Sequence, residues 1–61
     1  MPARRFNNVR EVNRAMNNAK TPLARVRIAR RGARDLGMEI GPGFNAAIRS
    51  GAVLRSSGRV G

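Results

Sequence analysis

The fold is decided by a basic segment at residues 22–36, which has the sequence PLARVRIARRGARDL. Thr21 can cap its N-terminus, and Pro22 suits the first helical position because the N–H that proline lacks would have no partner there. Gly37 is typical of the position just after a helix C-terminus. At 100° per residue, the spacing predicts an amphipathic helix with a cationic side and an apolar side. The cationic side carries Arg27, Arg30, Arg31 and Arg34, and the apolar side carries Val26, Ala29, Ala33 and Leu36, flanked by Ile28.

Two features of this segment weaken the helical interpretation. Gly32 lowers helix stability in the middle by about 1 kcal/mol relative to alanine. The alternation over residues 24–28 also fits a short strand, which remains as an alternative.

An earlier segment, residues 9–20, also has helical spacing. Asn8, followed three residues later by Glu11, matches an N-terminal capping pattern. The helix should end before Pro22, because the residue before a proline is steered away from helical geometry. Asparagines are poor helix formers, so we expect this helix to be weak without a partner. Its apolar side carries Val9, Val12, Ala15, Met16 and Ala19, and its polar side Arg10, Asn13, Arg14, Asn17 and Asn18.

After Gly37 the signals fade. Residues 41–43, Gly-Pro-Gly, predict a turn or linker, residues 44–50 fit a short third helix, and residues 56–61 suggest a loose tail. The sequence therefore predicts a mainly α chain. It has two short amphipathic helices at about 9–20 and 22–36, a short third helix at about 44–50, and an extended glycine-rich tail.

The chain is poorly equipped to fold alone. Of its 61 residues, 41% are hydrophobic, but nine are alanine, only two are phenylalanine, and tryptophan and tyrosine are absent. Without cysteine there is no disulfide, and without cysteine or histidine no zinc cage is expected. We therefore expect no large independent core, and we expect folding to need a partner.

The charge divides the chain into two parts. The net charge is +10, and twelve of the thirteen cations are arginine. Residues 1–34 hold ten cations and one acid, whereas residues 35–61 hold three arginines, two acids and six of the seven glycines. This asymmetry predicts a basic helical arm over residues 1–36 and a nearly neutral docking tail over residues 37–61.

The apolar side chains of the tail have two interpretations. They fold back onto the two helices, or they insert into grooves of a larger protein scaffold or shell, as segments that order on binding do. We favour the second interpretation. The predicted docking residues are Leu36, Met38, Ile40, Phe44, Ile48, Val53 and Leu54.

Composition argues against several functions. Without histidine or cysteine, and with only Glu11, Asp35 and Glu39 as acids, we expect no enzyme, no metal site, no cofactor and no small-molecule substrate. The uncharged stretch at residues 40–48 has nine residues, far short of the roughly 20 apolar residues of a membrane span. The N-terminus has no apolar stretch typical of a signal peptide, so we expect a non-secreted protein, inside a cell or a virus particle.

The arginine stripe is the most informative feature for function. Like charges three and four residues apart repel within an isolated helix, so concentrating them makes sense opposite an anionic surface. Arginine contacts to nucleic-acid phosphate give affinity that does not depend on sequence. Phe6 is the only aromatic residue near the basic arm, and we interpret the asparagines as caps and helix breakers rather than base readers. The predicted anion-binding residues are Arg27, Arg30, Arg31, Arg34, Arg10, Arg14, Arg4, Arg5 and Lys20.

These observations predict a non-enzymatic structural protein of a large nucleoprotein assembly. In composition alone the chain resembles small basic virion proteins and small ribosomal accessory proteins, although no motif identifies either class. One alternative is a cement or minor capsid protein whose arginines clamp acidic protein surfaces without touching nucleic acid. Another is a small DNA-binding regulator, although the joint at Thr21-Pro22 is short for a helix-turn-helix. Weak attachment to an anionic membrane surface is a further alternative.

Overall fold

The computed structural model describes residues 5–55 and 59–60 of the chain, and it confirms the mainly α class. Within these residues it contains three helices and one pair of two-residue strands. They are α1 (Val9–Asn17), α2 (Pro22–Asp35), β1 (Glu39–Ile40), α3 (Phe44–Arg49) and β2 (Arg59–Val60). None of the helices in the described part is long and apolar enough to span a bilayer.

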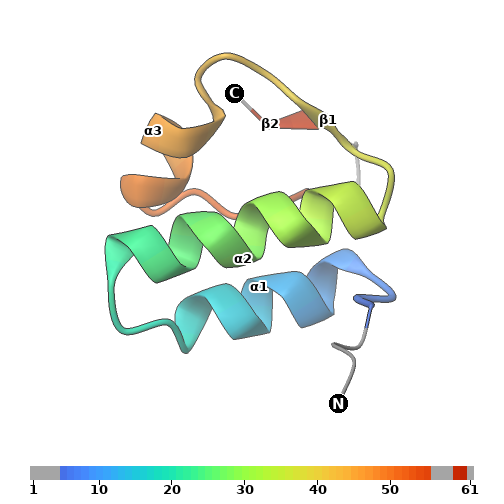
Figure 1. The fold of residues 1–61 in the computed structure, drawn as a ribbon, viewed down its shortest axis with the longest axis horizontal. Helices are drawn as coiled ribbons and strands as arrows, with labels where there is room; N and C mark the ends of the chain where they lie inside the picture. Colours follow the sequence, from blue (N-terminus) through green and yellow to red (C-terminus); the bar gives the residue numbers. More distant parts are fainter. Residues whose placement is uncertain (1–4, 56–58, 61) are drawn as a thin grey trace.

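Helix α2 is the centre of the structure. It packs against α1 on one side and against α3 on the other, and the segment after α3 returns behind it (Figure 1). The Cα extents are 31 × 25 × 16 Å, so the molecule is flat. Because α2 uses these contacts to build the core, its remaining side is left facing solvent.

Helix α1 begins with the predicted cap. The side chain of Asn8 accepts a hydrogen bond from the Glu11 backbone N–H at 2.9 Å, and the Glu11 carboxylate accepts one from the Asn7 N–H at 3.0 Å. The helix ends at Asn17, three residues before the predicted end, with Asn18 as its C-cap. Two consecutive asparagines explain the early end, because they have low helix propensity and bond readily to nearby backbone.

Helix α2 also begins as predicted, and it ends at Asp35, one residue before the predicted end, with Leu36 as its C-cap. The Thr21 hydroxyl accepts from the Ala24 N–H at 3.1 Å, and Pro22 is the first helical residue. At the other end Gly37 has φ of +68°, and the Met38 N–H reaches back to the Ala33 carbonyl at 2.8 Å. This left-handed residue satisfies the last carbonyls of the helix at no steric cost to glycine. The strand alternative for residues 24–28 is wrong.

Gly32 has a role that the sequence did not reveal. A Cβ atom built at this position would lie 2.5 Å from Cγ2 and 3.0 Å from Cβ of Val12 on α1, and would also collide with Cγ1. Gly32 therefore marks a point where α1 and α2 approach too closely for a side chain, and its low helix propensity is the cost of that approach.

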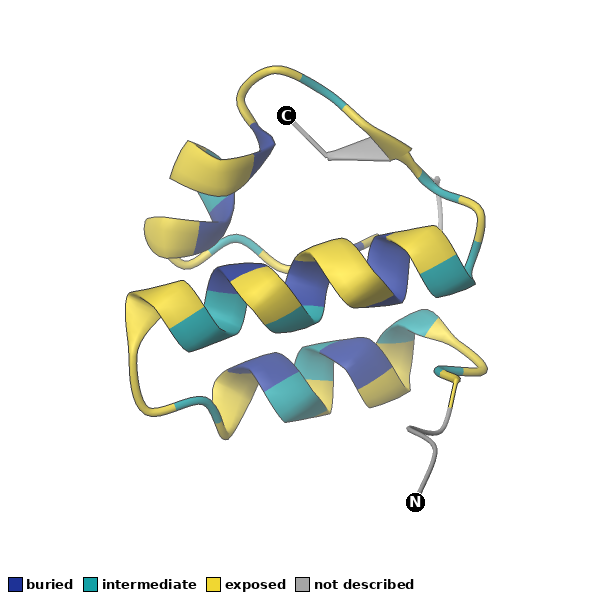
Figure 2. Cartoon of the chain, in the orientation of Figure 1, coloured by how far each residue is buried: buried dark blue, intermediate teal, exposed yellow. Residues whose placement is uncertain are grey.

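The core draws on all three helices and on the segment after α3. Phe44, Ile48 and Leu54 are at most 2% exposed, so the interpretation that they dock on another protein must be corrected. They fold back because α1 and α2 offer them an apolar surface within the same chain. The buried core consists of Val12, Met16, Val26, Ala29, Ala33, Phe44, Ile48 and Leu54 (Figure 2).

The end of the chain is only partly described. Residues 59–60 form β2 and pair in parallel with β1, with Glu39 opposite Arg59 and Ile40 opposite Val60. The predicted loose tail is therefore wrong for these two residues, because their backbone is paired with β1. The rest of that predicted tail, residues 56–58 and 61, lies outside the described residues.

Two polar side chains fasten the segment after α3 to the helices. Asn13 donates to the Leu54 carbonyl at 3.0 Å and accepts from the Leu54 N–H at 2.9 Å, as a neighbouring strand would. The guanidinium of Arg25 donates to the carbonyls of Ile48, Gly51 and Ala52 at 2.9, 3.1 and 2.8 Å. Together they hold the backbone on both sides of the turn that ends α3.

Candidate nucleic-acid interface

The four predicted arginines of α2 lie together on its solvent-exposed side. We call this surface, formed by Arg27, Arg30, Arg31 and Arg34, the Arg face; all four side chains are exposed. At 1.5 Å of rise per residue, the seven steps from Arg27 to Arg34 span about 10 Å along the helix axis. The exposed residues of α2 alternate with its buried ones along the helix in Figure 2. The prediction that α2 has a cationic side opposite an apolar side is thus confirmed.

The members of the Arg face differ in their contacts. Arg30 donates to the side-chain oxygen of Asn45 on α3 at 3.2 Å, and the guanidinium of Arg31 lies 5.8 Å from the centre of the Phe6 ring. Arg27 and Arg34 reach no hydrogen-bond acceptor, acid or ring among residues 5–55 and 59–60. Arg27 and Arg34 therefore keep all five guanidinium donors for a ligand.

The acid next to this face in sequence is bonded to the N-terminal segment. Asp35 follows the Arg face directly in sequence, and its carboxylate accepts from the Phe6 backbone N–H at 3.1 Å. Its carbonyl accepts from the guanidinium of Arg5 at 3.2 Å. These bonds tie the N-terminal segment to the end of α2 and place Phe6 beside Arg31.

The other predicted cations are spread over the molecule. Arg10 and Arg14 are exposed on α1, Lys20 is exposed in the connection before α2, and Arg5 is exposed near the end of α2. Arg4 lies outside the described residues. The structure therefore brings four of the nine predicted residues into one face, places Arg5 at the end of α2 and leaves Arg10, Arg14 and Lys20 on other elements.

Most asparagines of the basic arm contribute to the fold. Asn8 and Asn18 cap the two ends of α1, and Asn17 accepts from Arg25 at 3.3 Å. Asn13 is committed to Leu54. The interpretation of these residues as caps and breakers is confirmed for Asn8 and Asn18.

Arg25 is the residue that the sequence analysis missed. It is half-buried, and its three carbonyl acceptors make it part of the fold rather than of the Arg face. A signal was present: Arg25 lies four residues before Ala29, so the helical spacing places it on the apolar side of α2. An arginine on that side predicts a buried partner.

The described residues offer little for other chemistry. No group of three or more histidine, cysteine, aspartate or glutamate residues gathers in residues 5–55 and 59–60 to hold a metal ion. The carboxylates of Glu11 and Asp35 are occupied by backbone N–H groups. What the Arg face can do is donate charged hydrogen bonds to an extended anion.

The chain matches no protein-family model, no curated protein and no solved structure.

Proposed function

We propose that this chain is a non-enzymatic structural protein of a nucleoprotein assembly, virion-type or ribosome-type, whose Arg face neutralises nucleic-acid phosphate. The observation that carries the proposal is the pair Arg27 and Arg34. Both are exposed, both lack a partner among the described residues, and each faces two like charges three and four residues away.

Phosphate accounts for this arrangement better than solvent does. Arginine presents a planar fork of donors that matches a phosphate group, and contact with a polyanion releases counterions. The spacing along α2 puts several guanidinium groups within reach of successive phosphates on a strand. Non-specific binding of this kind typically has a Kd of about 10⁻⁴ to 10⁻⁶ M at physiological salt.

Salt-dependent binding tests the proposal. With about four phosphate contacts, one for each arginine of the Arg face, affinity for a random-sequence duplex should fall by about 10² between about 50 and 200 mM salt. Arg27→Gln and Arg34→Gln, singly and together, should lower the slope of log K against log salt by about 0.9 for each phosphate that is no longer neutralised. Arg49→Gln is the matched control, because it removes one exposed arginine from α3.

Two outcomes would show that the Arg face does not bind nucleic acid. An equal loss of slope for Arg34→Gln and Arg49→Gln would mean that net charge, rather than this face, binds nucleic acid. Binding no tighter than about 1 mM at low salt would refute the proposal and favour the alternative, a clamp on acidic protein surfaces.

A further inference from the structure

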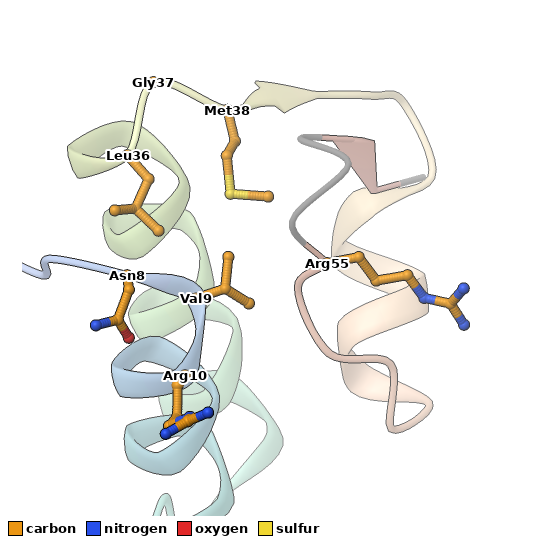
Figure 3. A pocket seen from close by; sticks show the side chains of 7 residues that line it. All are labelled: Asn8, Val9, Arg10, Leu36, Gly37, Met38 and Arg55. Carbon is orange, nitrogen blue, oxygen red and sulfur yellow. The ribbon is translucent and has the colours of Figure 1, made fainter.

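A hollow lies where the N-terminus of α1 meets the C-terminus of α2. Its volume is about 590 Å³, which falls within the range of about 300–1,000 Å³ typical of ligand pockets. No residue of the Arg face lines it. Among the residues that the structure describes, those lining it are Asn8, Val9, Arg10, Leu36, Gly37, Met38 and Arg55 (Figure 3).

The inner wall of the hollow is apolar and fixed in place. Val9, Leu36 and Met38 point toward one another across it, from α1 and from the end of α2 (Figure 3). All three are half-buried and pack against the core. The turn at Gly37 holds two of them, so the site is formed before any partner arrives.

The rim of the hollow is cationic. Arg10 and Arg55 are exposed and line it from α1 and from the segment after α3. In Figure 3 the guanidinium of Arg55 extends away from the three apolar side chains, toward solvent. A segment that fills the hollow and extends beyond it would therefore meet hydrocarbon inside and arginine outside.

Charge decides between the candidate occupants. A second copy of the chain would bring another net charge of +10 against this rim, and like charges oppose that association. An acidic occupant gains from both features of the site, because its carboxylates face arginine while an apolar side chain leaves water.

We propose that this hollow receives a large apolar side chain from an acidic segment of a neighbouring protein. This proposal rests on the proposed function, because it assumes a structural protein with a protein neighbour and names the surface where that neighbour docks. Two of the seven predicted docking residues, Leu36 and Met38, lie here. Phosphate binding and protein docking then use different surfaces, so one chain bridges nucleic acid and protein.

A defined peptide serves as the probe. The acetylated peptide EDLFDE offers apolar side chains flanked by acids, and EDSSDE carries the same charge without them. On the full chain, EDLFDE should bind with a Kd below about 1 mM and shift the methyl signals of Val9, Leu36 and Met38 in two-dimensional NMR. EDSSDE should bind at least about tenfold more weakly, because it buries no apolar surface.

Variants of the chain locate the binding. Arg55→Glu should weaken EDLFDE about tenfold, whereas Arg49→Glu, the same charge change on α3, should weaken it by about twofold or less. Met38→Gln should also weaken binding while removing no charge. Because Met38 touches the core, the helicity of Met38→Gln must be measured by circular dichroism alongside its binding. If Met38→Gln unfolds, the comparison of Arg55→Glu with Arg49→Glu tests the docking site.

Three results would overturn the inference: no methyl shift with about 5 mM EDLFDE, equal binding of the two peptides, or equal losses for Arg55→Glu and Arg49→Glu. A gain of about tenfold on deletion of residues 1–4 would also overturn it, because the chain's own N-terminus would then be the occupant. The nucleic-acid salt slope is measured on the same samples. A normal slope without peptide binding refutes only the docking site, and peptide binding without a slope refutes only the phosphate role.

Discussion

Gly32 sets the distance between α1 and α2, so Gly32→Ala should destabilise the protein even though alanine favours helices. The new Cβ would lie 2.5 Å from Cγ2 of Val12, and ordinary contact begins at 3.4 Å. The helices must therefore separate by about 0.9 Å or Val12 must turn. Turning relieves little, because both methyl groups and the Cβ of Val12 are close and a β-branched side chain in a helix has one strongly preferred rotamer.

The magnitude follows from two opposing effects. Overpacking costs about 1–3 kcal/mol, and replacing a mid-helix glycine by alanine returns about 1 kcal/mol. The net loss in the free energy of unfolding should be up to about 2 kcal/mol. With Val12→Ala in place, both methyl collisions are removed and only the 3.0 Å approach of the Cβ at position 12 remains, which a shift of a few tenths of an ångström relieves. Adding Gly32→Ala should then stabilise by up to about 1 kcal/mol.

The quantity to measure is the effect of Gly32→Ala on the free energy of unfolding, once in the natural chain, where it should be negative, and once in Val12→Ala, where it should be positive. Circular dichroism at increasing trimethylamine N-oxide gives the folding free energy of a marginal chain, because this osmolyte favours the buried state. The double-mutant cycle should show a coupling of about 1–3 kcal/mol between positions 12 and 32. If Gly32→Ala stabilises the chain in both backgrounds, the two helices do not approach at this position and the packing argument is refuted.

Two further predictions concern the polar groups that hold the segment after α3. Arg25→Met should lower the free energy of unfolding by about 1.5–3 kcal/mol, because three carbonyls lose a charged donor. Arg27→Met on the exposed side should instead raise it by about 0.4–1 kcal/mol, because it removes two like-charge repulsions. Equal effects in the same osmolyte titration would contradict the structural role of Arg25. Asn13→Asp should cost about 1–3 kcal/mol, because a carboxylate cannot donate to the Leu54 carbonyl; an unchanged stability would mean that this pairing does not hold the chain.

Local signals predicted much of the fold. The caps at Asn8 and Thr21 and the stop at Gly37 depend on residues within a few positions, so α1 and α2 were recognisable from sequence. The close approach at Gly32 was not, because it requires Val12 of another helix. The fate of Phe44, Ile48 and Leu54 was also open, since a spread of apolar residues does not say which surface will cover them.

The candidate site shows the same division. Helical spacing was enough to place the Arg face, because its four members belong to one element. The hollow joins Val9 and Arg10 of α1 to Leu36 and Met38 after α2 and to Arg55 after α3. Residues so far apart in the chain meet only through tertiary packing, which one sequence does not reveal.

The Arg face should itself cost stability in the free chain. Its four like-charge pairs at spacings of three and four residues are 27–30, 27–31, 30–34 and 31–34, and each involves Arg27 or Arg34. Arg27→Gln with Arg34→Gln therefore removes all four repulsions while leaving the contacts of Arg30 with Asn45 and of Arg31 with Phe6. At about 0.2–0.5 kcal/mol for each pair, the double variant should be more stable by about 1–2 kcal/mol at low salt.

That gain separates a working surface from a merely solvated one. A variant that folds better and binds duplex more weakly would show that the arginines oppose folding and serve a ligand. The gain should shrink as salt rises, because the repulsion between exposed charges is screened. If the double variant is less stable than the natural chain, Arg27 and Arg34 support the fold, and their exposure no longer argues for an anionic partner.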